Sequence, residues 1–314
     1  MESILVMSKK KTLKRQDIKY YLIAIAIVLL INLFSGEEGD TTDPNKQNID
    51  NSYVKEDTMQ VHFLDVEQGL SIVVQLGDEV LIYDGGDRDT SSFVVSYIED
   101  LGITEIDYMI SSHYDSDHLA GLIGCLKSYD VKNVIGSNYE HNSKLYTSFM
   151  DAVKDEGLKM QHPEVGTKYA FGDAEITILA PKEITDDSNA NSVAIKLSYG
   201  SSDFIFTGDA DYGSEREMVA SGIRLDCEVL SLAHHGSSTG NSSLFLEKTT
   251  PEFAVISCGK NNGYGHPHVE VVELLEAMEI DVFRSDVQGT VIASTDGVNI
   301  TWSEEPCNDY SDGN

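Results

Sequence analysis

The sequence predicts a mixed α/β domain in which two β-sheets lie inside and helices cover them on the outside. Three observations lead to this prediction. Short apolar runs bounded by turns dominate the chain after residue 57, and each run predicts a buried strand. Helical patterns separate the later runs. The first runs instead follow one another through tight turns at 67–69 and 76–78, an order that favours two mixed sheets over a doubly wound parallel sheet.

The expected elements follow one another along most of the chain. We expect strands at 61–66, 71–76, 80–83, 108–111, 131–135, 176–179, 193–197, 204–206, 229–233, 253–257, 282–284 and 290–294. We expect helices at 92–101, 144–156, 215–221 and 269–278. The polar segment 37–57 lacks periodicity and predicts a linker, and the acidic segment 305–314 predicts a disordered tail.

The composition is that of a globular protein, with 41% hydrophobic and 24% charged residues among 314. It excludes a disordered chain, a collagen and a coiled coil. Residues 1–36 hold 6 of the 22 basic and 2 of the 53 acidic residues, so residues 37–314 carry 16 against 51, a net charge of −35. Such a body repels polyanions, and we expect no broad nucleic-acid-binding surface. Phosphate chemistry would need a local positive centre, and a metal ion is the obvious one.

Residues 1–36 combine a basic start with an apolar run at 20–34, and acidic residues follow. This order is typical of an export signal. The run is short for a membrane-spanning helix, which needs about 17–25 residues. Because no small-x-small cleavage site follows, we expect an uncleaved signal anchor that holds the domain at the extracellular face of the cytoplasmic membrane. A cleaved signal peptide, which would give a secreted protein, and a buried core helix remain alternatives.

The four cysteines are scattered at Cys125, Cys227, Cys258 and Cys307, and none is paired at the spacing of a zinc site. A disulfide framework cannot be deduced from such positions, even for an exported chain. Cys227 and Cys258 lie in apolar, strand-like runs, so we expect buried free thiols there.

A cluster of potential metal ligands follows the expected strand at 108–111. Residues 113–118 read His-Tyr-Asp-Ser-Asp-His, which places His113, Asp115, Asp117 and His118 at a strand-to-helix junction. A divalent cation neutralises carboxylates and binds neutral imidazole nitrogens, so metal binding is the economical explanation. A polar surface turn is the alternative.

Two further strand ends carry similar side chains. Asp209 follows the expected strand at 204–206, and His234 and His235 follow the apolar run that begins at 229. Taken alone, Asp209 predicts a turn, and either histidine predicts a satisfied core residue. Together the three strand ends predict a site in which Asp209 lies between two ions.

These residues and several further motifs resemble the metallo-β-lactamase-fold hydrolases, and among them the hydrolase domain at the C-terminal end of the DNA-uptake competence protein ComEC. The motif at 113–118 is similar to the H-x-D-x-D-H variant of the broader H-x-H-x-D-H signature. Further matches occur in the family's order at 61–69, 81–86, 189–193, 206–209, 233–237 and 254–268. The resemblance implies a hydrolase domain at 58–304 with an αββα sandwich of two mixed sheets flanked by helices, and a two-metal site between the sheets.

The resemblance also implies roles for single residues. The metal ligands implied are His113 and Asp115 for the first ion, Asp117, His118 and His235 for the second ion, and Asp209 as the bridge. His234 would face the substrate, with the reverse assignment within the pair as the alternative. Asp84 resembles the family's acid that supports the first ligand loop.

Four further residues are candidates for substrate contact. His266 and His268 lie in a Gly/Pro loop, and the resemblance implies contact with the phosphate or the leaving group, with a solvated loop as the alternative. Asn191 and Ser192 stand where many relatives supply another metal-binding histidine. That absence leaves the first ion with few protein ligands.

The chain departs from the family's V-G-Q-G-D motif at 66–70, where Glu67 replaces a glycine and Leu70 replaces the acid. Leu70 removes a polar contact near the site. We interpret this difference as a change in substrate or activity rather than as a loss of the enzyme.

The sequence therefore predicts an exported or membrane-anchored, metal-dependent hydrolase that attacks phosphate esters with a metal-bound hydroxide, as phosphodiesterases and nucleases do. Two divalent ions, zinc or manganese, would be its cofactors. Asp117 or Asp209 would accept a proton, and His234 or His266 would help to stabilise the leaving oxygen. Hydrolysis of a small ester, lactone or phosphocholine-type substrate is one alternative, and a catalytically weak surface binding protein is another.

Overall fold

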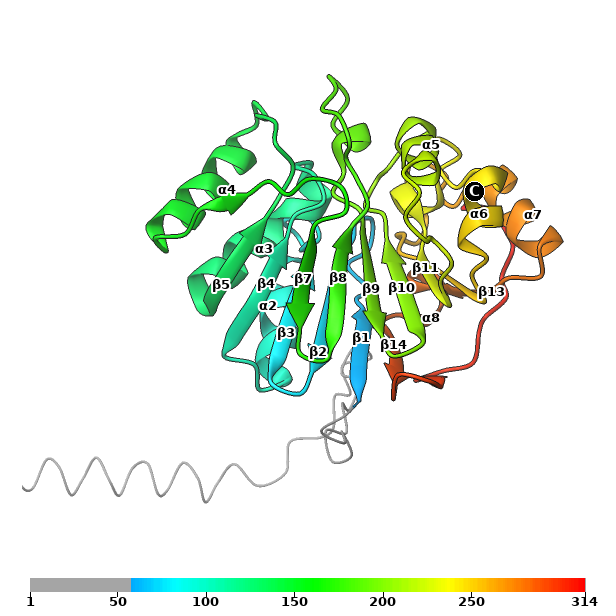
Figure 1. Cartoon of the computed structure of the whole chain (residues 1–314), viewed down its shortest axis with the longest axis horizontal. Helices are drawn as coiled ribbons and strands as arrows, with labels where there is room; N and C mark the ends of the chain where they lie inside the picture. The colour runs from blue at the N-terminus through cyan, green and yellow to red at the C-terminus, as the bar shows by residue number, and fades with distance from the viewer. Residues whose placement is uncertain (1–57, 314) are drawn as a thin grey trace, which may run out of the picture. The chain divides into compact units, whose positions relative to one another are not determined.

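The computed structural model describes residues 58–313. Their strands form two sheets that lie face to face, and Figure 1 looks onto the second sheet with the first sheet behind it. The expected anchor at 1–36 and the expected linker at 37–57 lie outside the described residues. Within 58–313, no helix has the length and apolar character that crossing a membrane requires.

The first sheet has eight strands. In spatial order they are β15 (Ile300–Trp302), β14 (Val291–Thr295), β1 (Met59–Phe63), β2 (Ile72–Leu76), β3 (Glu79–Tyr83), β4 (Glu105–Ile110), β5 (Asp130–Ile135) and β6 (Met160–Gln161). Neighbours are antiparallel from β15 to β3 and parallel from β3 to β6. In this register Phe63 pairs with Ile72 on one side and with Val291 on the other.

The second sheet has seven strands. In spatial order they are β13 (Asp281–Arg284), β12 (Phe253–Ile256), β11 (Val229–Ser231), β10 (Ser202–Phe206), β9 (Ile195–Tyr199), β8 (Ala174–Ile178) and β7 (Lys168–Phe171). Neighbours are parallel from β13 to β10 and antiparallel from β10 to β7. Each sheet therefore has a parallel part whose carboxyl ends share one edge, the place where α/β folds bind ligands.

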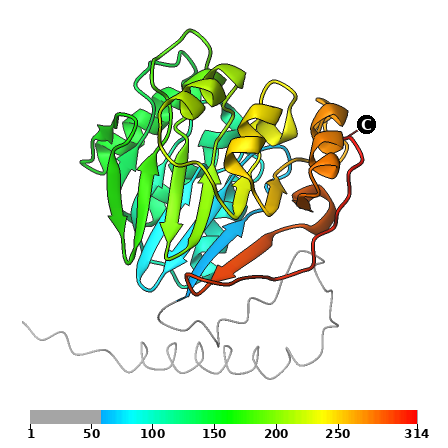
Figure 2. The ribbon, with the colours of Figure 1, turned by 45° about the vertical axis from the view of Figure 1, so that its right-hand side comes forward.

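Helices cover the outer faces of both sheets. They are α2 (Ser91–Asp100), α3 (Ser116–Ser128), α4 (Lys144–Asp155), α5 (Tyr212–Ala220), α6 (Ser243–Thr249), α7 (Val269–Ala277) and α8 (Ser285–Gln288). His62 on the outer face of β1 lies against α2, with its Nδ1 2.9 Å from the Tyr97 hydroxyl. Met218, Phe245 and Val272 of α5, α6 and α7 pack on the outer face of the second sheet. The structure thus confirms the predicted sandwich of two mixed sheets flanked by helices (Figure 2).

The main core fills the space between the two sheets. Alternate residues of β1, Met59, Val61 and Phe63, point into it, and each buried side chain of this size contributes roughly 1.5–3 kcal/mol. The single tryptophan, Trp302 of β15, stacks on Phe283 of β13 with ring centroids 3.9 Å apart. This pair joins an edge strand of one sheet to an edge strand of the other.

The strands that the sequence did not predict, β6, β7 and β15, all lie at the edge of a sheet. β7 alternates between exposed and less exposed residues, so it contains no apolar run that would mark it as a buried strand. Buried strands carry a continuous apolar signal, whereas edge strands mix polar and apolar residues.

Residues 305–313, which belong to the segment expected to be a disordered tail, pack along β13 and end beside α7 (Figure 2). The Arg284 guanidinium donates hydrogen bonds to the carbonyls of Asp309 (3.1 Å) and Ser311 (2.6 Å). The backbone N–H of Gly313 donates to the carbonyl of Pro267 at 3.0 Å. Arg284 therefore holds this acidic segment largely through backbone carbonyls.

All four cysteines are free thiols, and Cys125, Cys227 and Cys258 are buried. This confirms the prediction for Cys227 and Cys258. Burial raises the pKa of the Cys125 thiol to about 12, so that side chain behaves as an apolar residue.

Candidate metal centre

The candidate ligands lie in loops that follow the parallel strands of both sheets. His113 and Asp115 lie between β4 and α3, and Asp117 and His118 belong to the first turn of α3. Asp209 follows β10 of the second sheet. Ligands from two sheets therefore meet at one edge of the sandwich, as the positions of the strand ends predict.

Two glycines fix the position of α3 on the end of β3. The N–H of Gly85 donates to the carbonyl of His118 at 2.6 Å, and the N–H of Gly121 donates to the carbonyl of Gly85 at 3.0 Å. A Cβ atom on Gly121 would clash with the Gly85 carbonyl oxygen. The close backbone contact fixes the main chain at His118.

His234 and His235 follow β11 in a strained turn. Their φ angles are 50° and 56°, in the left-handed region that costs a non-glycine residue of order 1–3 kcal/mol. Such strain persists only where the surroundings fix it, and it is frequent at functional sites. The turn brings both imidazoles to the Asp209 carboxylate.

One group of ligands surrounds the Oδ1 atom of Asp209, and we call it the Oδ1 half. It consists of Asp117, His118 and His235 with Asp209 Oδ1. The Nε2 atom of His118 lies 3.1 Å from Asp209 Oδ1, and that of His235 lies 3.8 Å from it. Asp117 Oδ2 lies 3.4 Å from His235 Nε2 and 3.9 Å from His118 Nε2.

A second group surrounds the Oδ2 atom of Asp209, and we call it the Oδ2 half. It consists of His113, Asp115 and His234 with Asp209 Oδ2. The Nε2 atoms of His113 and His234 lie 3.9 Å and 3.6 Å from Asp209 Oδ2, and Asp115 Oδ2 lies 3.7 Å from His113 Nε2. His234, which we expected to face the substrate, is thus as near to the bridging carboxylate as His235 is.

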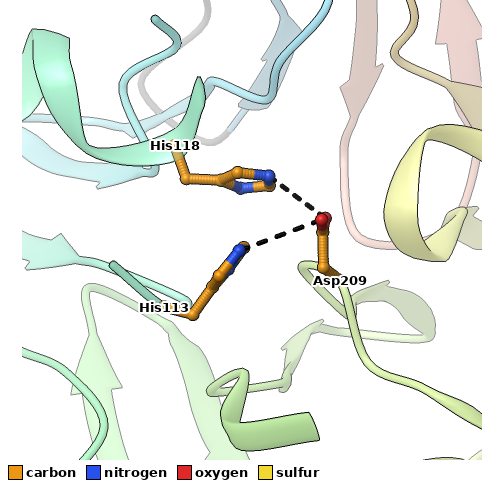
Figure 3. Close-up of side chains that lie close together, drawn as sticks. All are labelled: His113, His118 and Asp209. Atoms are coloured by element: carbon orange, nitrogen blue, oxygen red, sulfur yellow. Dashed lines mark ion pairs between the residues drawn. The ribbon is translucent and has the colours of Figure 1, made fainter. Parts of the chain in front are cut away.

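The donor atoms fit divalent metal ions. Ligands at the usual Zn–N and Zn–O distances of a tetrahedral site lie about 3.4 Å from one another, close to the separations found here. Four of these atoms, Nε2 of His113, His118 and His235 and Oδ1 of Asp209, are buried and have no hydrogen-bond partner among the described residues. Figure 3 shows how His113 and His118 converge on Asp209. Buried polar atoms without a partner are costly, and bound cations would satisfy all four.

The hydrogen bonds behind the imidazoles set which ring nitrogen faces the centre. His118 Nδ1 donates to Asp84 Oδ2 at 2.8 Å, and His235 Nδ1 donates to the Ser257 carbonyl at 2.9 Å. In the neutral ring, Nε2 therefore presents a lone pair to the metal position. Asp84 also accepts a hydrogen bond from the backbone N–H of Ser112 at 2.7 Å, so it contacts the loop that carries His113.

The imidazoles of the Oδ2 half rest on hydroxyl groups instead. His113 Nδ1 lies 3.0 Å from Ser112 Oγ, and His234 Nδ1 lies 3.0 Å from Thr239 Oγ1. Ser112 donates its own proton to Asp84, so it accepts the Nδ1–H of His113. Thr239 Oγ1 donates to Ser237 Oγ at 3.1 Å, so it likewise accepts the Nδ1–H of His234.

Asp115 is held by a chain of hydrogen bonds with a defined direction. The backbone N–H of Tyr114 donates to the Tyr139 hydroxyl at 3.1 Å. The Tyr139 and Ser188 hydroxyls are 2.7 Å apart, and Ser188 donates to Asp115 Oδ1 at 2.8 Å. This chain leaves Asp115 Oδ2 for the metal position. His141 is also close, with its Nε2 3.7 Å from Asp115 Oδ1.

The sequence analysis missed Tyr139, His141 and Ser188. Residues 139 and 141 follow the expected strand at 131–135 and so belong to the same edge as the ligand loops, which is the signal that would have identified them. Ser188 lies in a polar loop that carries no such signal.

The charges of the site shift its pKa values strongly. Burial raises the pKa of Asp209, but the neighbouring His118 and His235 outweigh burial and hold that pKa well below its usual range. Burial likewise lowers the pKa of His118, but Asp209 and Asp84 outweigh it and raise that pKa well above its usual range. Burial lowers the pKa of His234, and Asp209 offsets this only in part. A cation that binds would replace the proton of His118.

Three of the residues expected to contact substrate are engaged elsewhere. The Asn191 carboxamide is buried and bonds the backbone of Thr185, accepting at 2.8 Å and donating at 2.9 Å. Ser192 Oγ accepts the N–H of Asp209 at 3.1 Å, so it supports the bridging residue. The hydrogen bonds of these two side chains hold the ligand loops, and the structure gives no reason to assign them to substrate.

His268 is engaged in the same way. Its Nδ1 accepts the N–H of Ser238 at 3.0 Å, and its Nε2 donates to the carbonyl of Tyr264 at 3.2 Å. Both ring nitrogens are used, so His268 holds its loop beside the His234–His235 turn rather than offering a group to a substrate.

His266 remains a candidate for substrate contact. Its ring centroid lies 5.3 Å from that of His234, and Gln68 Nε2 lies 3.3 Å from its Nδ1. Gln68 Oε1 accepts the N–H of Gly259 at 3.1 Å, so the amide nitrogen is the donor to His266. Burial and the neighbouring histidines lower the pKa of His266 to about 3. The ring is therefore neutral, with its proton on Nε2.

Leu70 lies in the core between the sheets rather than at the metal position. Its backbone N–H donates to the carbonyl of Asp117 at 3.1 Å. The aliphatic side chain therefore replaces a polar group without removing a ligand from either half.

Comparisons with known proteins agree with this geometry. The sequence model of the metallo-beta-lactamase superfamily matches residues 64–260. The ComE operon protein 3 of Bacillus subtilis (strain 168) is 28% identical over 252 residues, which cover 74% of this chain and 32% of that protein. The competence protein ComA of Neisseria gonorrhoeae is 30% identical over 241 residues, or 76% of this chain and 32% of that protein.

The chain thus spans about a third of the length of these relatives. Among solved structures, the metallo-beta-lactamase fold protein YhfI from Bacillus subtilis superposes with a TM-score of 0.51 at 16% identity, over 76% of this chain and 99% of that one. This likeness shows the fold alone. Because the superfamily's sequence model covers more than half of the chain, the chain belongs to the metallo-β-lactamase superfamily, and its homologues are competence proteins of the ComEC family.

Proposed function

We propose that the chain is a metal-dependent hydrolase of phosphate esters, of the phosphodiesterase type. The observation that carries this proposal is the Asp209 carboxylate, which has two imidazole nitrogens near each of its oxygens: those of His118 and His235 near Oδ1, and those of His113 and His234 near Oδ2. Asp117 and Asp115 lie beside these imidazoles. Two cations on a shared carboxylate form the arrangement that stabilises both the attacking and the leaving oxygen of an in-line displacement.

The Oδ1 half would hold one divalent ion and the Oδ2 half another. Four imidazoles and three carboxylates suit zinc or manganese. We propose His234 as a ligand of the Oδ2 half, where it supplies the imidazole that Asn191 and Ser192 do not provide. When bound, such ions neutralise the charge of a phosphate and lower the pKa of a coordinated water.

The chain's own residues supply the remaining functions. Asp117 keeps 30% of its side chain exposed and Asp209 lies between both halves, so either carboxylate would accept a hydrogen bond from a coordinated water and orient it. The neutral His266 offers its Nε2–H as a hydrogen-bond donor to an oxygen of the substrate. The His266 ring lies beside that of His234.

The charge of the protein favours a phosphate ester over a neutral ester. Residues 37–314 carry a net charge of −35, and the site itself adds three carboxylates among its ligands. Two divalent ions offset those carboxylates and leave a local positive centre, which an anionic ester needs and a neutral ester does not. Electrostatics therefore selects anionic substrates at the site and repels long polyanions elsewhere.

We also propose that the segment 20–34 anchors the domain to the membrane, at the extracellular face, or directs its secretion if it is cleaved. The support for this is the basic start, the apolar run and the polar linker of the sequence. Fractionation of cells that express the full chain, followed by protease treatment of intact spheroplasts, tests it. Protection of the domain from the protease would contradict it.

The activity is tested with the full chain, purified in a mild detergent, stripped with a chelator and reloaded with zinc or manganese. We expect about two ions per chain by elemental analysis and metal-dependent turnover of bis(4-nitrophenyl) phosphate. Asp209→Asn should abolish both, whereas Asp78→Asn, an exposed carboxylate on the β2–β3 turn at the opposite edge, should change neither. If the fully loaded protein hydrolysed 4-nitrophenyl acetate or a lactone but no phosphodiester, the proposal would be wrong and the substrate would be a neutral ester.

A further inference from the structure

A pocket of about 570 Å³ lies at the same edge of the sandwich as the metal centre, and we call it the side pocket. It is lined by the loops 136–138, 162–165 and 181–184, which follow β5, β6 and β8, together with Val193 before β9 and residues 220–221 at the end of α5. β5 and β6 run parallel to β4, and β9 runs antiparallel to β10. The carboxyl ends of β5 and β6 and the amino end of β9 therefore share the edge that carries His113 and Asp209.

Hydrogen bonds connect the lining of the side pocket to the ligands. The N–H of Val193 donates to the carbonyl of Ser112, the residue before His113, at 2.8 Å. The Tyr114 hydroxyl donates to the carbonyl of Ser137 at 2.5 Å. The loop 136–138 leads directly to Tyr139, whose hydroxyl belongs to the chain that ends on Asp115. The side pocket is thus connected to the Oδ2 half by the Val193–Ser112 hydrogen bond and by the loop that leads to Tyr139.

The lining is balanced in charge. It contains one lysine, Lys182, and one acid, Glu164. A second phosphate or a polyanion would need an excess of positive charge, which this pocket does not offer and the acidic body opposes. The occupant that fits is therefore uncharged.

The lining also offers both apolar contact and unsatisfied polar groups. Ile184 exposes 44% of its surface, and prolines at 163 and 181 add flat apolar walls. Ser137 is 2% exposed, and its hydroxyl has no hydrogen-bond partner among the described residues. His162 donates from Nδ1 to the carbonyl of Gly136 at 2.9 Å, which leaves Nε2 of the neutral ring as an acceptor. Such a mixture suits a ring with hydrogen-bonding edges.

We propose that the side pocket binds the uncharged, ring-bearing substituent of a phosphate ester whose phosphate lies at the metal centre, with a heterocycle such as a nucleobase as the chemical class. This inference rests on the proposed function. It adds that selectivity among phosphate esters arises in the loops beyond β5 and β8, away from the metal ligands. A buried hydroxyl without a partner rejects an apolar ring and accepts one that presents a hydrogen-bonding atom.

The test compares two esters with the same leaving group, thymidine 5′-(4-nitrophenyl phosphate) and methyl 4-nitrophenyl phosphate, on the metal-loaded full chain. We expect kcat/KM to favour the thymidine ester at least tenfold. Ile184→Trp, which fills the side pocket, should lower this ratio about tenfold, mainly through KM, and Ser137→Ala should lower it about threefold. Val298→Trp places the same bulk on the exposed turn between β14 and β15 and should leave the ratio unchanged.

An equal loss for both esters in Ile184→Trp, or a wild-type ratio near one, would overturn the proposal while leaving hydrolysis itself intact. If no ester is turned over, thymidine binding measured by saturation-transfer NMR separates the proposed side-pocket ligand from the proposed hydrolase function. Binding to the wild type and to Asp209→Ala, with loss in Ile184→Trp, supports the side pocket alone. Absence of thymidine binding together with absence of turnover overturns both.

Discussion

The Oδ1 half and the Oδ2 half of the metal centre share Asp209 but are held in different ways. In the Oδ1 half, His118 and His235 are almost fully buried and rest on a carboxylate and a carbonyl, which can only accept a hydrogen bond. In the Oδ2 half, the side chains of His234 and Asp115 are 24% and 38% exposed and rest on hydroxyls. One bridging carboxylate therefore serves a preorganised half and an adaptable half, and we expect the Oδ1 half to bind its ion more tightly.

Removal of the shared residue should have the largest effect, because it acts on both halves at once. In Asp209→Ala the metal content should fall well below one ion per chain, and phosphodiester turnover should fall at least about 10³-fold. Elemental analysis and kinetics with bis(4-nitrophenyl) phosphate measure the two quantities. If this variant retained two ions, Asp209 would not be a shared ligand, and the division of the centre into two halves around it would be wrong.

Removal of one imidazole from each half should show which half binds more tightly. His235→Ala takes away a buried ligand with a fixed tautomer, so we expect loss of the tighter ion and about a 100-fold loss in affinity. His234→Ala removes a ligand whose side chain is only 24% exposed but belongs to the adaptable half, so we expect about a tenfold loss that affects only the weaker ion. Isothermal titration of the apoprotein with zinc resolves both ions. Normal metal binding in His234→Ala with reduced turnover would return His234 to the role of a substrate contact.

A smaller effect should follow from Ser188→Ala, which removes the donor to Asp115 and leaves the Oδ1 half untouched. Residues that orient a ligand typically account for about 10–100-fold in affinity, and the exposure of Asp115 places this one near the lower end. We expect the weaker ion to bind about tenfold less tightly, measured by competition with a chromogenic chelator. Ser148→Ala, on the exposed face of α4, is the matched control. A change in the tighter ion instead would show that the two halves are not independent.

The last prediction concerns how the affinity for each ion depends on pH. Because the pKa of His118 is raised, this imidazole is protonated at neutral pH, and the ion of the Oδ1 half must displace that proton. Its affinity should therefore rise with pH, about tenfold per unit for one displaced proton, until the pKa of His118 is reached. The pKa of His234 is lowered, so no proton needs to leave that ring above pH 6.5. Titrations at pH 6.5 and 7.5 should show a steeper change for the tighter ion, and equal slopes would contradict this reading.

The sequence predicted the fold, and it placed the candidate ligands at neighbouring strand ends, because both predictions depend on contiguous signals. The buried strands are continuous apolar runs, and His113, Asp115, Asp117 and His118 stand in one motif directly after such a run. Asp209 and the histidine pair follow other buried strands in the same way. Parallel strands bring their carboxyl ends to one edge, so these positions could be placed together without the structure.

What the sequence could not show is which polar side chains are already occupied. Asn191 and His268 stand in motifs of the family, but their hydrogen bonds go to the backbone of Thr185, Ser238 and Tyr264. Ser188 reaches Asp115 from a loop 73 positions away in the chain. Hydrogen bonds of this kind are tertiary, and residue type and spacing carry no information about them.

The fluorescence of Trp302 reports on the packing of this domain. It is the single tryptophan of the chain, and it contacts Phe63 of one sheet as well as Phe253 and Phe283 of the other. Its emission therefore senses whether the two sheets remain pressed together, whatever happens to the ligand loops. A site variant that loses its ions but keeps the native emission spectrum has lost metal binding while its two sheets remain packed. Tryptophan fluorescence makes this distinction without an added fluorophore.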